Sequence, residues 1–235
     1  MKKIITLVIL IIFIIFLGIS FYKKWVELKD FLTLIWFIPL TIAALFQDDI
    51  KRFISAPKLE IEFELGPPYC LKTTMKSKVT TPDGRIQRFK WDAYYFRFRV
   101  KNRGGSQAKL CECVAEKLWV YGDGGWSEDK TFQAVNLNWS NSKTQDEFLN
   151  INPNSPGWFC DLVHLENIPG KMMSIDYRSP FPNSQYAEIV PNIKHKILVV
   201  IYSENNKSVS REFEIHWTGE WRDEPNEMFE QVKIK

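Results

Sequence analysis

Two long runs of apolar residues come first in the chain, and they predict a pair of transmembrane helices. Residues 4–22 form the first run, nineteen positions without a charged side chain. At about 1.5 Å per residue this run is about 28 Å long, close to the hydrocarbon thickness of a bilayer. The second run covers residues 28–46 if Lys29 and Asp30 sit at the interface, and Pro39 lies inside it. Residues 1–56 are therefore expected to form a membrane anchor.

Two other interpretations of these runs fit the residues less well. A cleaved signal peptide has a shorter apolar region, about 7–15 residues, and ends at a small-residue cleavage site. The first run is longer and ends in residues 18–24, GISFYKK. A buried amphipathic helix needs a polar stripe at helical spacing, and residues 31–46 have none. We expect both helices to stay in the membrane.

Basic and aromatic residues flank the two predicted spans, as is typical of membrane interfaces. The expected interface residues are Lys23, Lys24, Trp25, Lys51 and Arg52. Five basic residues lie near the spans on the side of the termini, against three in the loop between them. The positive-inside rule therefore favours a two-span protein of the cell membrane with its C-terminal domain in the cytoplasm. Residues 47–56 are expected to form a juxtamembrane turn ending before Pro57.

Beyond residue 57 the pattern changes to strict alternation, which predicts β-strands. In residues 58–65 the apolar side chains alternate with three glutamates, which predicts one buried and one solvated face. Residues 94–101 repeat the pattern, with Tyr94, Phe96, Phe98 and Val100 inward and basic residues outward.

More short strands are expected along the rest of the chain. They are residues 108–121, 135–139, 158–165, 172–177, 196–203, 208–217 and 228–234. A bulge near Leu110 would reconcile two conflicting faces in the first of these. Turns rich in Gly and Asn separate them at residues 102–105, 122–125 and 204–207. This spacing predicts a mainly β domain, a β-sandwich, over residues 57–235.

One of these turns carries a resemblance to a known family. Residues 100–108, VKNRGGSQA, resemble the V-x-N-x-G…A signature of prokaryotic immunoglobulin-like sandwiches, including the CARDB-type repeats. Residues 201–215 are similar to the closing hairpin of such domains. The resemblance implies an Ig-like sandwich behind a transmembrane hairpin, as in prokaryotic membrane proteins with one such domain. It implies no activity.

Charge is unevenly distributed between the two parts of the chain. Residues 1–56 hold seven basic and four acidic residues, so the remainder holds 24 of each and is neutral. A neutral domain lacks the electrostatic footprint that nucleic acid requires, which is a clustered basic face. We therefore expect no nucleic-acid partner.

The four cysteines, Cys70, Cys111, Cys113 and Cys160, could be paired or free, and a domain of this size favours free buried thiols. Together with His164, three of them could form a zinc site. However, zinc ligands usually come on tight knuckles such as C-x-x-C, whereas Cys111 and Cys113 alternate within one strand. We expect no metal and no cofactor.

Catalytic constellations are also missing from the sequence. Cys160, Asp161 and His164 are close in sequence, but in an extended strand Asp161 faces away from Cys160, and four residues span about 13 Å. No G-x-S-x-G, Walker or dinucleotide-binding motif occurs. The sequence predicts no catalytic residues and a protein that is not an enzyme.

Tryptophan is the one unusual enrichment, with nine in the chain. Core packing explains most of them, but Trp126, Trp158 and Trp221 fall at strand ends or turns, where with Arg222 they could form a binding surface. The expected function is a non-enzymatic interaction or adaptor module, held at the lipid bilayer, that binds a protein partner or a second copy. The alternative is a membrane effector of stress or defence, whose β domain senses a ligand while its helices oligomerise.

Overall fold

The structure is a computed structural model, and it divides the chain into two compact units, Met1–Ala56 and Pro57–Lys235. It describes residues 14–16, 18–24, 27, 29, 33, 36, 40, 41, 44, 46, 47, 55–80, 83–140, 148–178 and 188–235.

Helix accounts for most of what is described of the first unit. Its helical residues include 14–16 and 18–22, and Lys23 and Lys24 form a turn closed by hydrogen bonds to the carbonyls of Ile19 and Phe21. Of the predicted interface residues, Trp25, Lys51 and Arg52 lie outside the described residues, as does much of both predicted spans. Within the described residues, no single helix has the length and hydropathy needed to cross a bilayer.

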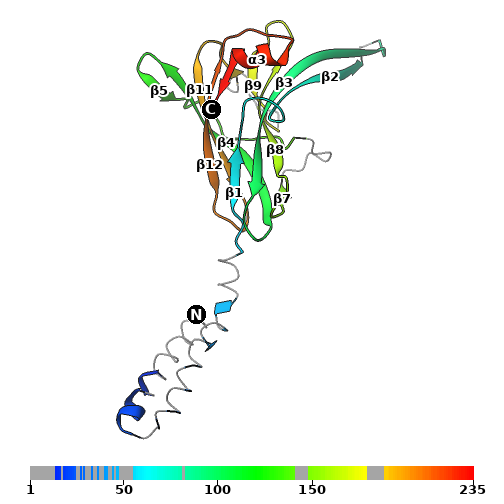
Figure 1. Cartoon of the computed structure of the whole chain (residues 1–235). Helices are drawn as coiled ribbons and strands as arrows, with labels where there is room; N and C mark the ends of the chain where they lie inside the picture. The colour runs from blue at the N-terminus through cyan, green and yellow to red at the C-terminus, as the bar shows by residue number, and fades with distance from the viewer. Residues whose placement is uncertain are drawn as a thin grey trace. The chain divides into compact units, whose positions relative to one another are not determined.

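The second unit is mainly β and consists of two antiparallel sheets packed as a β-sandwich (Figure 1). The first sheet has the order β1 (Leu59–Glu62), β3 (Ile86–Asn102), β8 (Trp158–Glu166), β9 (Met173–Ile175) and β10 (Glu188–Ile189), and β2 (Cys70–Thr80) also pairs with β3. The second has the order β13 (Val232–Ile234), β12 (Val209–Trp217), β11 (Lys194–Tyr202), β4 (Ala108–Gly122) and β5 (Gly125–Glu128), with β6 (Val135–Asn136) and β7 (Leu149–Ile151) also on β4.

One hydrophobic core lies between the sheets, and the predicted alternation explains it. The side chains expected to point inward from β3, Tyr94, Phe96, Phe98 and Val100, are all fully buried. The facing sheet contributes the inward side chains of β11 and β12, which are Ile197, Val199, Ile201, Phe213 and Ile215. The prediction of a two-sheet β domain is confirmed.

The bulge predicted near Leu110 is also confirmed. Leu110 has a positive φ of 49°, and the register between β4 and β7 shifts between Ala108 and Cys111. Because of this shift Ala108, Cys111 and Cys113 are all buried although their spacing breaks the alternation.

The predicted strands differ from the structure in several places. β3 begins at Ile86 and not at Tyr94, β6 covers only Val135–Asn136 of the predicted residues 135–139, and β2 was not predicted. The strand expected over residues 58–65 ends at Glu62, because the chain then leaves the sheet through Gly66, Pro67 and Pro68. The strand expected over residues 228–234 is wrong in its first half, since helix α3 (Pro225–Gln231) precedes β13. Proline in the first helical turn favours this helix, and its short length hid the helical period.

Candidate binding surface

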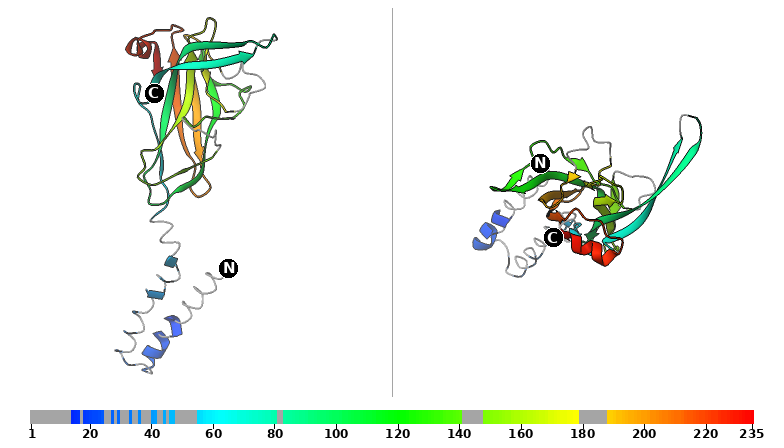
Figure 2. Two further views of the ribbon diagram at one scale, coloured as in Figure 1. Left: turned by 90° about the vertical axis from the view of Figure 1, so that its right-hand side faces the viewer. Right: turned by 90° about the horizontal axis from the view of Figure 1, so that it is seen from above.

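The distal half of the β2–β3 hairpin, called the arm here, is exposed over most of its length. It consists of Met75–Thr80 and Ile86–Trp91, which pair over six residues from Met75 opposite Trp91 to Thr80 opposite Ile86. The β8 strand pairs with β3 only from Ala93 onward, so within the described chain the arm is a two-stranded ribbon without a third strand. Figures 1 and 2 show it projecting beyond the sandwich.

Residues directly opposite each other in an antiparallel pair lie on the same face, so the register decides which side chains share a surface. Lys76 lies opposite Lys90, and Lys78 lies opposite Arg88. All four side chains are exposed. This set, called the cationic face, places like charges directly across the ribbon, an arrangement that destabilises a hairpin.

Nothing in the described part of the chain neutralises the cationic face. None of its four residues makes an ion pair there, whereas most other basic residues on β3 do, including Arg99 and Lys101 with Glu62. Residues 75–91 hold five basic side chains and a single acidic one, Asp83. Arg85 pairs with Asp83, and the charge of the four residues of the cationic face is available to a ligand.

The opposite side of the ribbon is apolar. Met75 lies opposite Trp91, while Val79 and Phe89 follow on the same face toward the tip. Val79 is 47% exposed and Phe89 46% exposed, and Met75 and Trp91 are half-buried. These four residues are called the apolar face. A two-stranded ribbon is at best marginally stable in water, and this one leaves large apolar groups in contact with solvent.

The base of the arm is firmly attached to the sandwich. Lys72 Nζ contacts Asp92 Oδ2 at 3.3 Å and Asp223 Oδ1 at 3.2 Å, and Tyr94 donates a hydrogen bond to the Asp223 carbonyl at 2.9 Å. Burial opposes the charge on Lys72, but its hydrogen bonds to Asp223 and Asp92 outweigh burial and raise its pKa. These contacts hold the direction of the arm. Its innermost pair is also attached to the sandwich, because Trp91 Nε1 donates a hydrogen bond to Glu166 at 2.9 Å and Tyr95 donates one to Met75 Sδ. The outer five pairs, from Lys76–Lys90 to Thr80–Ile86, have no such contact among the described residues.

Two residues of the predicted binding surface lie beside this base. Trp221 packs on Tyr94 with ring centroids 5.0 Å apart, and its indole donates a hydrogen bond to Asp223 Oδ1 at 3.1 Å. Arg222 is half-exposed and pairs with Glu220. Trp221 therefore supports the root of the arm from the loop before α3.

The other two predicted residues lie on different elements. Trp126 is on β5 in the second sheet, where Lys196 Nζ lies 4.8 Å from its ring centroid. Trp158 begins β8 opposite Val100, toward the end of β3 that is remote from the arm. The structure brings Trp221 and Arg222 together and places Trp126 and Trp158 elsewhere.

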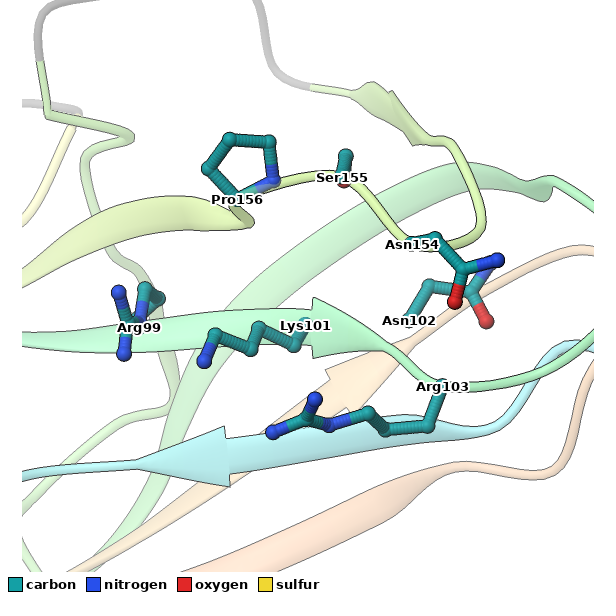
Figure 3. Close-up of a pocket in the computed structure, with 7 residues that line it drawn as sticks. All are labelled: Arg99, Lys101, Asn102, Arg103, Asn154, Ser155 and Pro156. Atoms are coloured by element: carbon teal, nitrogen blue, oxygen red, sulfur yellow. The ribbon is translucent and has the colours of Figure 1, made fainter.

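A second candidate site is a pocket of about 310 Å³ at that remote end of β3, shown in Figure 3. Its lining includes Arg99, Lys101 and Arg103, together with Asn154 and Ser155 of the loop before β8. The pocket contains much less free charge than this lining suggests.

The acidic face of β1 neutralises the basic residues of the pocket. Glu62 Oε2 lies 2.7 Å from Arg99 and 2.9 Å from Lys101, and Arg103 contacts both Glu60 and Glu62. Burial works against the charge of Glu62, but hydrogen bonds from Lys101 and Arg99 lower its pKa to about 2. These residues hold β1 against β3, so the pocket is a weaker candidate than the arm.

The cysteine and histidine considered for metal or thiol chemistry are on opposite sides of the first sheet. Cys160 lies opposite the inward Phe98 and is fully buried, while His164 lies opposite the outward Tyr95. Burial raises the pKa of Cys160, so its thiol is a poor nucleophile. Among the described residues, no group of three or more potential ligands is placed to hold a metal ion.

A polar network on the outer side of the same sheet was not predicted. The register of β8 shifts opposite Phe96 and Arg97, so that Asp161 and His164 both face outward. His164 Nδ1 lies 3.3 Å from Asp176, and Ser140 donates a hydrogen bond to Asp161. The hydroxyl and the imidazole contact different carboxylates, so the network has no nucleophile–base pair.

The charge on the arm was missed because charge was counted over the whole domain. Residues 75–91 alone carry a surplus of basic residues, and a local count would have found it. Comparisons of the chain with protein-family models, with curated proteins and with solved structures found no match.

Proposed function

We propose that the protein is a membrane-tethered, non-enzymatic binding module whose binding element is the β2–β3 arm. One observation carries the proposal: the register places four cations, none of which makes an ion pair among the described residues, on one face of the ribbon, and Met75, Val79, Phe89 and Trp91 on the other. Both features weaken the free domain, so a bound partner that covers them is the simplest account of both.

Support for the tether comes from the first unit. Its two apolar runs have the length of membrane spans, and its described helical residues expose large apolar side chains, with Phe16 59% and Trp36 73% exposed. Apolar side chains in such numbers are stable in lipid and unstable in water. Recovery of the full chain without detergent, after a high-salt wash, would contradict the tether. A C-terminal reporter active on only one side of the membrane tests the expected cytoplasmic domain.

Support for an Ig-like sandwich comes from Asn102, in the turn that resembles the family signature. Its side-chain oxygen accepts hydrogen bonds from the amides of Lys58 and Gly104, and its nitrogen donates to the carbonyls of Ser106 and Ile151. Asn102 is almost completely buried. The resemblance to CARDB-type domains leads one to expect an Asn–Gly pair in a turn between two core strands and an Ala that returns inward, and Asn102 between β3 and β4 and the buried Ala108 agree with that expectation.

Site-specific photocrosslinking in cells tests whether the arm is the binding element. A photoreactive phenylalanine analogue replaces Phe89 in the full chain, and a matched variant carries it at Leu110, which is equally exposed on β4. Adducts, identified by intact mass and by gel shift, are expected at position 89 and not at position 110. Equal adducts at both positions, or none at position 89, would overturn the proposal.

A further inference from the structure

We propose that the partner of the arm is the surface of an anionic phospholipid bilayer. The inference rests on the proposed function and names the chemistry of its ligand. Val79 and Phe89 of the apolar face would enter the headgroup–acyl boundary, while the cationic face (Lys76, Lys78, Arg88, Lys90) reaches the phosphates. Met75 and Trp91, which hydrogen-bond to Tyr95 and Glu166, would stay at the edge of the sandwich.

Both faces of the arm have a role only at such a surface. An interfacial element carries Trp, Phe or other apolar groups on one side and Lys or Arg on the other, and long basic side chains extend to the headgroups. A ribbon only two strands wide brings its two faces within reach of the same interface. The arm has this composition over the five cross-strand pairs from Met75–Trp91 to Val79–Gln87, and the last pair, Thr80–Ile86, carries no charge.

Nucleic acid would use only half of this surface. A two-stranded β-ribbon fits the major groove, and the cationic face could contact phosphates. The apolar face, with Val79 and Phe89 nearly half exposed, would stay in water in that complex. A second copy of the chain would cover the apolar face but would leave two cationic faces without counterions.

The position of the arm within the domain also fits a role in reaching a surface. Leu59, where the domain begins, pairs with Asn102 at one end of β3, and Ile86 of the arm lies at the other end. Along the curved β3 strand of 17 residues, the contour length between the two points is about 50 Å. The arm therefore contacts lipid at a point remote from the start of the domain.

The expected strength follows from the charge. Each basic residue close to an anionic membrane strengthens binding about fivefold, so removal of four should weaken it at least about a hundredfold. The effect must fall steeply with added salt, because exposed charges are screened over about 10 Å at 0.1 M.

The test uses the full chain with a fluorescent reporter on the arm. Gln87 is exposed and lies opposite Val79 on the apolar side. Because all four native cysteines are buried, Gln87→Cys can be labelled selectively with an environment-sensitive dye. In the first experiment, the labelled chain is placed in neutral phosphatidylcholine nanodiscs and mixed with phosphatidylserine vesicles. In the second experiment, the nanodiscs themselves contain phosphatidylserine and no vesicles are added.

The expected result is a blue shift of the dye in at least one of the two experiments and none with phosphatidylcholine alone. A shift in the first experiment means that the surface is a second membrane, and a shift in the second means that it is the surrounding membrane. Two variants must lose the shift: one in which the four residues of the cationic face become Gln, and Val79→Ser with Phe89→Ser. Their matched controls must keep it. The first control has Lys109, Lys130, Lys207 and Lys233 changed to Gln; the second has Leu110→Ser and Val190→Ser.

No shift in either experiment, or equal shifts in variants and controls, would overturn the lipid assignment. Binding of a short DNA duplex without a lipid response would overturn it in favour of nucleic acid, and protein adducts at position 89 would favour a protein partner. In both cases the arm remains the binding element. Absence of any adduct at position 89 would instead count against the proposed function.

Discussion

Lys78 of β2 lies directly opposite Arg88 of β3, and the neighbouring pair on that face, Lys76 and Lys90, is also like-charged. Folding alone gives no reason for two such pairs in succession, because each is repulsive and none of the four has an ion-pair partner within the described chain. The pairs are explained by a ligand that supplies the missing negative charge.

Arg88→Glu should therefore stabilise the arm while weakening its binding. The new carboxylate lies opposite Lys78, and a cross-strand pair of opposite charge is worth up to about 1 kcal/mol. Hydrogen exchange of the amides in Met75–Thr80 and Ile86–Trp91 is expected to slow several-fold. Lys207→Glu, in the exposed turn between β11 and β12, serves as the control and should leave these amides unchanged. Faster exchange in the arm of Arg88→Glu would contradict the repulsion argument.

Asn102→Ala should destabilise the domain by about 3 kcal/mol or more. The substitution removes four hydrogen bonds and leaves buried backbone amides and carbonyls without a partner. Asn205→Ala is a matched control. Asn205 also bridges two backbone groups, Lys109 N and Gln107 O, but at an exposed turn where water can replace it. Urea unfolding should show a loss of no more than about 1 kcal/mol for the control. Equal losses for the two variants would show that burial of Asn102 does not matter.

All four thiols should resist modification until the domain unfolds. Burial raises the pKa of Cys70 to about 11 and that of Cys111 to about 12, and it raises those of Cys113 and Cys160 as well. A thiol that stays protonated reacts slowly. A colourimetric disulfide reagent at pH 8 is expected to modify none of them rapidly in the native protein and all four in urea. Rapid reaction of any one in the native state would contradict its burial.

The inward face of β3 could be predicted because strict alternation from Tyr94 to Val100 has a single interpretation once a core exists. The arm shows the limit of this reasoning. Residues 75–91 alternate as well, but alternation does not tell whether a third strand pairs along the edge of the ribbon. That depends on where β8 stops pairing, which is a tertiary fact: its last partner on β3 is Ala93.

The tryptophans were a weaker guide for a related reason. Their positions at strand ends were visible in the sequence, but which ends lie together depends on strand order. Trp221 reaches the root of the arm because the loop before α3 returns to Lys72 and Tyr94. No local pattern encodes that long-range contact. A count of charge over short windows, by contrast, would have pointed to the arm without any structure.

The outward network of β8 predicts that the domain loses stability as pH rises from about 5 to 8. Burial and the charge of Asp176 raise the pKa of Asp161 from 3.8 to about 7, so between these values the folded state holds a proton that the unfolded state has lost, and stability falls. For His164, burial opposes the charge, but the hydrogen bond to Asp176 outweighs burial and raises the pKa. The contribution of His164 to stability is therefore present below pH 6.5 and is lost above it.

Melting temperatures measured from pH 5 to 8 should decline, and Asp161→Asn should flatten the decline. Asp223→Asn should not, because hydrogen bonds from Trp221 and Lys72 lower the pKa of exposed Asp223, which therefore titrates only in acid. A slope unaffected by Asp161→Asn would mean that this carboxyl is already ionised in the folded protein at neutral pH.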